Sequence, residues 1–191
     1  MGTGFIGSVH AKNIARHPGV QLVAVSDVNI ESAKNIAAAT GAEAVSDIAE
    51  IFNNRAIHAV LVATPTDTHV NYLQHAADAG KAIYCEKPIG LDYEEAEKAV
   101  RAVRATGVPV MLGFNRRFDE SHAALRQALD RGEVGKVEIV QLTSRGPKPP
   151  PISYVKVSGG QLRDQTIHFF DLLRWLTNES LKTGQPMKMT T

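Results

Sequence analysis

The chain has 191 residues, a length that allows one compact domain or one complete domain with part of a second. Its 21 basic and 20 acidic residues leave a net charge of +1, so no strong field favours a nucleic acid or an anionic membrane as partner. The single cysteine excludes an internal disulfide, and because we find no signal peptide and no long apolar run, we expect a cytoplasmic protein.

The first motif is GTGFIG at residues 2–7, which has the spacing G-x-G-x-x-G. Gly2 and Gly4 allow a tight turn with close backbone approach, and Gly7 allows a helix to pack on a sheet. The helix is predicted at 8–17, and its first backbone amides would receive a pyrophosphate. The alternative is a glycine-rich turn that binds no ligand.

An apolar, β-branched run at 20–26 predicts the next strand, which ends at Asp27. This acid stands about 20 residues after Gly7, where a dinucleotide site places the acceptor for the adenine-ribose hydroxyls. Its charge would repel a 2′-phosphate. We therefore expect NAD as the cofactor, with NADP less favoured.

Helices and strands continue to alternate after Asp27. Further strands are predicted at 44–45, 59–63, 82–85 and 108–112. Helices are predicted at 30–39, from a Ser46 cap onward, at 69–79 and at 93–106. This alternation favours a doubly wound parallel sheet of the Rossmann type, with ligands beyond the carboxyl ends of the strands.

Thr64, Glu86 and Gly113 follow such strand ends. Lys87, between Glu86 and Pro88, could donate to a substrate hydroxyl or carry a proton, although an exposed Glu–Lys pair is the simpler interpretation. The remaining histidines are scattered and are assigned mostly to helix surfaces or loops, with His69 as the exception because it starts a helix beyond the Thr64-Pro65 loop.

The pattern changes at about residue 120, where we expect a domain junction between 1–120 and 121–191. The second part contains a predicted helix at 121–131, an alternating strand at 136–144, a proline-rich loop at 147–151, a helix at 161–176 and a polar tail from Thr177.

Asp164 and His168 stand four residues apart in the last predicted helix, so they project from one face. Such a pair can hold a hydroxyl while the imidazole removes its proton. It could also begin a metal site, but we find no third ligand with convincing spacing; a surface ion pair is the plainer alternative.

Both ends look incomplete. Only Met1 precedes the glycine-rich turn, where a strand of about five residues is usual and is central in the sheet. The second part has one strand, whereas a stable sheet needs about three. We expect a chain that is truncated at both ends.

Six motifs occur in order: GTGFIG at 2–7, Asp27, ATPTDTH at 63–69, EKP at 86–88, GFNRRFD at 113–119 and SGGQLRDQTIHFFDLLRWL at 158–176. In this order the chain resembles the glucose-fructose oxidoreductase and inositol dehydrogenase family, and within it the myo-inositol 2-dehydrogenases. The resemblance covers nearly all of 1–178. It implies a Rossmann domain, part of an α/β open-sheet substrate domain, and NAD(P)-linked oxidation of a secondary hydroxyl of a cyclitol or sugar.

The resemblance also implies residue roles. His168 would be the general base, while Lys87 and Asp164 orient the hydroxyl. The same three residues, with Asn115 and Arg116, would bind the small-molecule substrate. The residues expected at the cofactor are Gly2, Gly4, Phe5, Ile6, Gly7, Asp27, Thr64, Pro65, His69, Glu86 and Lys87. Full-length members would be homo-oligomers, and no metal is expected.

Two departures from the family pattern leave the substrate open. The family pattern has an acidic residue directly after the histidine or one place later, whereas here Phe169 and Phe170 precede Asp171. Gly146 stands where the pattern frequently has an acidic residue. One alternative is a related dehydrogenase for another sugar or cyclic diol. A second is a non-catalytic fragment that holds NAD weakly or associates with other chains.

Overall fold

The computed structural model describes residues 1–179 except 147 and 151. Two positions of the predicted proline-rich loop, and the predicted polar tail beyond Glu179, therefore lie outside the described residues. The chain divides into two compact units, Met1–Gly113 and Phe114–Thr191.

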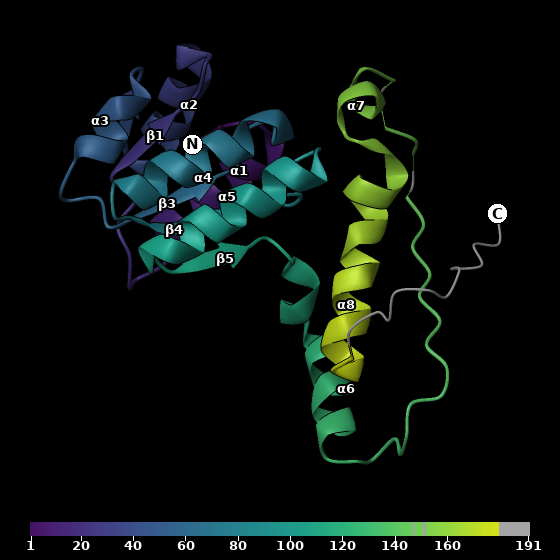
Figure 1. Ribbon diagram of the computed structural model, residues 1–191. Helices are drawn as coiled ribbons and strands as arrows, with labels where there is room; N and C mark the ends of the chain where they lie inside the picture. Colours follow the sequence, from purple (N-terminus) through teal and green to yellow (C-terminus); the bar gives the residue numbers. More distant parts are fainter. Residues whose placement is uncertain (147, 151, 180–191) are drawn as a thin grey trace. The chain divides into compact units, whose positions relative to one another are not determined.

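The first unit alternates helices with short parallel strands (Figure 1). Its elements are α1 Phe5–Arg16, β1 Ala24–Ser26, α2 Ile30–Thr40, β2 Glu43–Val45, α3 Ile48–Asn53, β3 Ala59–Val62, α4 Thr66–Asp78, β4 Ala82–Cys85, α5 Tyr93–Thr106 and β5 Val110–Leu112. Strand β1 pairs with β2, and a second sheet has the order β3-β4-β5. The predicted α/β fold with parallel strands is confirmed.

The first two residues join the two sheets. The Met1 amino group donates to Leu61 O at 2.8 Å, and the Ala63 N–H donates to Met1 O at 2.9 Å. On the other side, the Gly2 N–H donates to Ser26 O at 2.8 Å. Met1 and Gly2 therefore lie between the carboxyl ends of β1 and β3, the central position that a doubly wound sheet gives to the strand before its glycine-rich turn.

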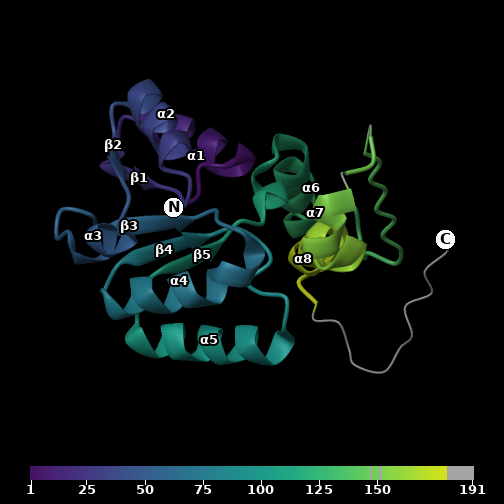
Figure 2. The ribbon, with the colours of Figure 1, turned by 90° about the horizontal axis from the view of Figure 1, so that it is seen from above.

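Two hydrophobic cores hold this unit together. The larger packs β3 and β4 against α4 and α5, and includes the fully buried Val62, Ala76 and Cys85. The smaller lies among α1, α2 and the β1-β2 pair. Figure 2 shows α4 and α5 on one side of the strands, with α1 and α2 on the other. Packing of the strands into these cores fixes the positions of the loops at their carboxyl ends.

Helix boundaries follow local capping chemistry. The Asp92 side chain accepts the Glu95 N–H at 2.9 Å and starts α5, and Gly107 ends it with a φ of 75°. The start of α3 differs from the prediction. Asp47, and not Ser46, caps this helix, because its carboxylate accepts the N–H of the second helical residue at 2.9 Å.

The regular elements among the described residues of the second unit are all helical. They are η1 Asn115–Phe118, α6 Glu120–Asp130, α7 Ile152–Val157, the π-helical turn η2 Leu162–Thr166 and α8 Ile167–Thr177. Arg117 donates two hydrogen bonds to the carboxylate of Asp171 in α8, one of them from Nε at 2.8 Å. Arg126 donates to the carbonyls of Trp175 and Leu176, so α6 caps the carboxyl end of α8.

The predicted strand at 136–144 is wrong. These residues form neither helix nor strand, and Ile139, which the alternation would bury, is 88% exposed. A strand exists only through hydrogen bonds to a neighbour, and the described part of the second unit contains no strand to pair with it. Among the described residues, no helix has the length and apolar character needed to cross a membrane.

Candidate active site

The glycine-rich turn stands at the carboxyl ends of β1 and β3 and leads directly into α1. Gly2 has a φ of +79°, and a Cβ there would come within 2.5 Å of Ala63 O. At Gly7 a Cβ would meet Gly2 O at 2.0 Å. Gly2 is therefore required for its backbone conformation as well as for space, and Gly7 for close packing of the helix on the turn.

The first turn of α1 presents backbone N–H groups to open space. Gly4 occupies the N-cap, no described side chain caps the helix, and its first turn has no acidic residue. A Cβ at Gly4 would meet no atom within 4 Å, and Phe5 and Ile6 are exposed beside it. Unpaired N–H groups together with the helix dipole make this end suitable for a pyrophosphate. The residues present therefore fit a dinucleotide.

Asp27 follows β1 beside this turn. Thr3 donates its N–H to Asp27 Oδ2 at 2.6 Å and its hydroxyl to the same oxygen at 2.9 Å, and the Asn29 N–H donates to Oδ1 at 2.9 Å. Partial burial opposes the charge, but these hydrogen bonds outweigh it and lower the pKa of Asp27 below its ordinary value. The carboxylate is thus a fixed negative charge at neutral pH, and its remaining lone pairs can accept hydroxyl groups.

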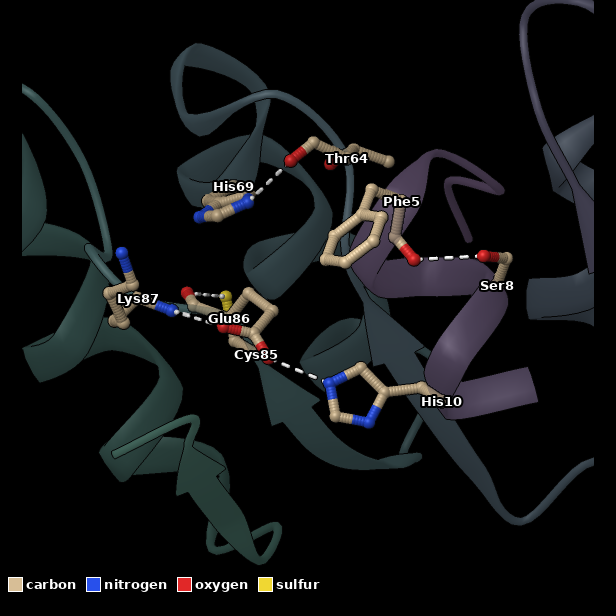
Figure 3. Close-up of polar contacts among 8 residues, drawn as sticks. All are labelled: Phe5, Ser8, His10, Thr64, His69, Cys85, Glu86 and Lys87. Carbon is tan, nitrogen blue, oxygen red and sulfur yellow. Dashed lines mark hydrogen bonds and ion pairs between the residues drawn. The ribbon is translucent and has the colours of Figure 1, made fainter. Parts of the chain in front are cut away.

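The loop after β3 is held in place by His69 of α4. The imidazole is 1% exposed, and its Nε2 lies 2.8 Å from Thr64 O (Figure 3). Its Nδ1 lies 2.7 Å from Pro88 O. Thr68 adds a hydrogen bond from its hydroxyl to Thr64 Oγ1 at 2.7 Å. His69 was expected at the cofactor, and that role stays a prediction; in the structure its buried ring bonds to two loops. Its two ring nitrogens join the loop of Thr64 to the loop of Pro88.

The segment after β4 carries Glu86 and Lys87. The Glu86 carboxylate lies against α1, with Oε1 at 2.7 Å from His10 Nε2, and its Oε2 accepts the Lys87 N–H at 3.3 Å. The Lys87 side chain lies on the side away from His10 (Figure 3). Burial, then the charge of Glu86, raises the pKa of Cys85 to about 12, so this thiol is not a nucleophile at neutral pH.

His10 is a site residue that sequence reasoning missed. It was assigned to the group of surface and loop histidines, yet its ring is half-buried and reaches the carboxyl end of β4. One signal was present: His10 lies three residues after Gly7, the residue by which α1 packs on the turn, so both occupy one face of the helix. Its partner, 76 residues away, carries no such signal.

In the second unit, Asp164 lies on the π-helical turn and His168 on α8. Asp164 is 6% exposed and accepts hydrogen bonds from the Tyr154 hydroxyl and from Gln165 Nε2, both at 2.9 Å. The His168 ring stands edge-on to Phe114, with ring centroids 6.3 Å apart. The predicted single helix is therefore a π turn continued by an α-helix, and Tyr154 is a partner that the sequence did not indicate.

Asn115 and Arg116 lie on η1 and are exposed, so their assignment to the substrate stays a prediction. Asp171 turns its carboxylate to Arg117 and is 9% exposed, which makes it a structural residue of this unit. The described residues include no cluster of three or more His, Cys, Asp or Glu side chains arranged to hold a metal ion.

Comparison with known proteins identifies both parts of the chain. A family model described as an oxidoreductase family with an NAD-binding Rossmann fold matches residues 1–114, and a GFO/IDH/MocA C-terminal domain model matches residues 122–185. An inositol 2-dehydrogenase of Rhizobium meliloti strain 1021 is 48% identical over 179 residues, which are 94% of this chain and 54% of that protein. The chain thus spans about half the length of the curated relatives it matches.

Solved structures agree with these relatives. The structure of a myo-inositol dehydrogenase from Corynebacterium glutamicum superposes with a TM-score of 0.84 at 42% identity, over 92% of this chain and 53% of that one. A scyllo-inositol dehydrogenase from Lactobacillus casei, with bound NAD(H) and scyllo-inositol, gives a TM-score of 0.78 at 29% identity, over 93% of this chain and 54% of that one.

Proposed function

The chain belongs to the GFO/IDH/MocA oxidoreductase family, and from this we propose that it serves NAD-dependent oxidation of a secondary hydroxyl of inositol or a related polyol. Its NAD-binding domain would end near residue 120 and be followed by part of the substrate domain. In this role it would act in the cytoplasm as part of a homo-oligomer. The substrate would be a small polyol or sugar, as the names of the inositol dehydrogenase relatives suggest.

The observation that carries the proposal is the pairing of an uncapped helix start with a fixed carboxylate. The first N–H groups of α1 would hold the pyrophosphate, and Asp27 would accept the adenine-ribose hydroxyls. A 2′-phosphate would place two further negative charges beside Asp27, which favours NAD over NADP. When bound, NAD⁺ supplies the acceptor for the hydride.

The residues of this chain would handle the proton and the substrate hydroxyl. We assign His168 as the base that takes the hydroxyl proton at a ring nitrogen. Lys87 would donate a hydrogen bond to the same oxygen and stabilise its developing negative charge. Asp164, held by Tyr154 and Gln165, would orient the hydroxyl.

We assign supporting roles to further positions. Thr64, Pro65 and Glu86 would line the cofactor cleft. His69 would hold the Thr64 loop in shape through its contact with Thr64 O. Asn115 and Arg116 would stand near the substrate. The same residues would serve a dehydrogenase for another sugar, so only substrate profiling separates that alternative.

Calorimetric titration of the 191-residue chain with NAD⁺ and NADP⁺ tests the cofactor assignment. We expect NAD⁺ to bind at least about tenfold more tightly, and Asp27→Ala to remove the difference. Equal or reversed preference in the parent would refute the role of Asp27. Absence of binding to either would refute a nucleotide site in this chain.

The reaction is tested by NADH formation with myo-inositol, scyllo-inositol and glucose. Lys87→Ala should lower kcat/KM by at least about tenfold, because it removes a donor to the developing alkoxide. Lys98→Ala, on the exposed face of α5, is the matched control. A Lys87 variant as active as this control would overturn the catalytic assignment.

A further inference from the structure

Thr3 lies inside the glycine-rich turn, between Gly2 and Gly4, and none of the roles assigned above uses its side chain. The residue is only 6% exposed, although it stands next to the open start of α1. Its hydroxyl donates to Asp27 Oδ2 at 2.9 Å, and its N–H donates to the same oxygen at 2.6 Å. The buried hydroxyl is therefore satisfied by the carboxylate that we assign to the adenine ribose.

Described residues donate three hydrogen bonds to Asp27, and one of them depends on the choice of side chain. The N–H groups of Thr3 and Asn29 are backbone donors, which any residue except proline would supply at these positions. The third donor is the Thr3 hydroxyl, and among short side chains only serine and threonine offer one. The amino acid at position 3 thus adds a contact that the backbone of the turn does not provide by itself.

These donors are shared unequally between the two carboxylate oxygens. Oδ2 receives both groups of Thr3, whereas Oδ1 receives, from the described part of the chain, only the Asn29 N–H at 2.9 Å. Oδ1 therefore keeps a lone pair for an incoming hydroxyl group. The side-chain torsion of an aspartate carboxylate has no sharp preference of its own, so its hydrogen bonds decide its direction. The carboxylate of Asp27 cannot turn without breaking both bonds from Thr3.

We propose that Thr3 is a positioning residue for cofactor specificity, whose hydroxyl fixes the Asp27 carboxylate in the orientation that selects NAD over NADP. The proposal rests on the proposed function, which places the adenine ribose at Asp27. A carboxylate that is already ordered accepts the ribose hydroxyls at a lower entropic cost, and it cannot swing away from a 2′-phosphate. A mobile carboxylate would bind NAD less tightly and would repel the phosphate less. Thr3 would act through Asp27 and needs no contact with the cofactor.

The test compares variants of the 191-residue chain by calorimetric titration with NAD⁺ and NADP⁺, and takes the ratio of the NADP⁺ Kd to the NAD⁺ Kd. Thr3→Val keeps the shape of the side chain but removes the O–H, and the ratio should fall by at least about threefold. Thr3→Ser keeps the hydroxyl and should keep the parent ratio. In an Asp27→Ala background, Thr3→Val should leave the ratio unchanged, because the group that it positions is gone.

A second measurement needs no cofactor: the pKa of Asp27 is read from the carbon-13 resonance of its carboxyl group through an acid titration. Burial raises this pKa, while hydrogen bonds from the backbone of Thr3 and Asn29 and from the Thr3 hydroxyl lower it. Thr3→Val removes one of these donors, so the pKa should rise, and Thr3→Ser should keep it at the parent value. Thr40→Val is the matched control for both measurements, because the Thr40 hydroxyl donates to Ile36 O of its own helix at 2.7 Å.

If the parent prefers NAD⁺ and Thr3→Val keeps its ratio, the proposal is overturned, and an unchanged pKa of Asp27 in that variant overturns it as well. A merely structural role for Thr3 would weaken both cofactors equally and leave the ratio as it is; circular dichroism verifies that each variant is folded. A parent without preference refutes the cofactor role of Asp27, and with it selection through Thr3. The proposed function thus fails in the parent chain, whereas the inference about Thr3 can fail in its variants alone.

Discussion

At the scale of single residues, the buried carboxylate of Asp164 depends on a hydroxyl from another segment. Burial, followed by the hydrogen bond to Asp164 and its charge, raises the pKa of Tyr154 to about 12, so this hydroxyl remains a donor throughout the neutral range. Tyr154→Phe would remove that donor from a carboxylate that is 6% exposed. We expect a loss of about 1–2 kcal/mol in unfolding free energy.

Urea denaturation of the Tyr154→Phe variant measures this loss. Tyr93→Phe supplies the matched control, since Tyr93 is 73% exposed and no hydrogen bond of its hydroxyl is described. Indistinguishable midpoints for the two variants would show that the Tyr154 hydroxyl does not stabilise Asp164.

Asp27 makes stability depend on acid. Because hydrogen bonds lower its folded-state pKa, the stabilisation is complete above the unfolded value of about 4 and is lost as pH falls through the folded value. Asp27→Asn should therefore be less stable than the parent at neutral pH, and the difference should shrink below about pH 4.

Urea unfolding at about pH 7, 5, 4 and 3 checks this dependence. Asp78→Asn, on an exposed carboxylate bonded to Gln74, is the control. A deficit of equal size at every pH would mean that the charge of Asp27 has no part in the effect.

The predictable part of the site consists of residues whose signals are local. Gly2, Gly7 and Asp27 follow from a spacing read within 26 residues of the chain, and the turn requires glycine at Gly2 and Gly7 but not at Gly4, where a Cβ would meet no atom. The contacts of His10 with Glu86 span 76 residues, and no spacing rule joins them. Such pairs depend on how α1 packs against the end of β4. Patterns within a single segment do not predict this packing.

At the scale of elements, prediction succeeded where a segment carries its own boundaries. Strand β4 has the predicted limits and is flanked by Gly80 and Glu86. Helix α5 also has the predicted limits, because Asp92 and Gly107 cap it. The segment 136–144 has equally regular alternation, but the strand predicted for it is absent from the structure. A helix forms its hydrogen bonds within itself, whereas a strand takes them from a neighbour that no local pattern guarantees.

Native-state hydrogen exchange distinguishes these two cases. Amides of 136–144 should exchange at nearly the rate of an unstructured peptide, since no backbone hydrogen bond joins them to another described residue. Amides of β4, paired on both sides, should be slower by at least about a thousandfold. Protection of 136–144 comparable to that of β4 would show that the segment is a paired strand in solution.

At the scale of the whole molecule, the residues expected at the cofactor are carried by one unit and the Asp164–His168 pair by the other. Among the described residues, the hydrophobic cores of the first unit involve none beyond Leu112. The glycine-rich turn, Asp27 and Glu86 belong to the same unit. The cofactor half of the proposed function should therefore be separable from the catalytic half.

A chain of residues 1–113 should fold by itself and bind NAD⁺ with a Kd within about threefold of the 191-residue chain. Its length is sufficient for an independent domain, and its buried apolar side chains contact one another. Far-UV circular dichroism through a urea titration tests folding, and calorimetry tests binding, with Asp27→Ala in the short chain as control. A folded short chain that does not bind would show that the second unit contributes directly to the nucleotide site. An unfolded one would show that the cores of the first unit do not suffice for its stability.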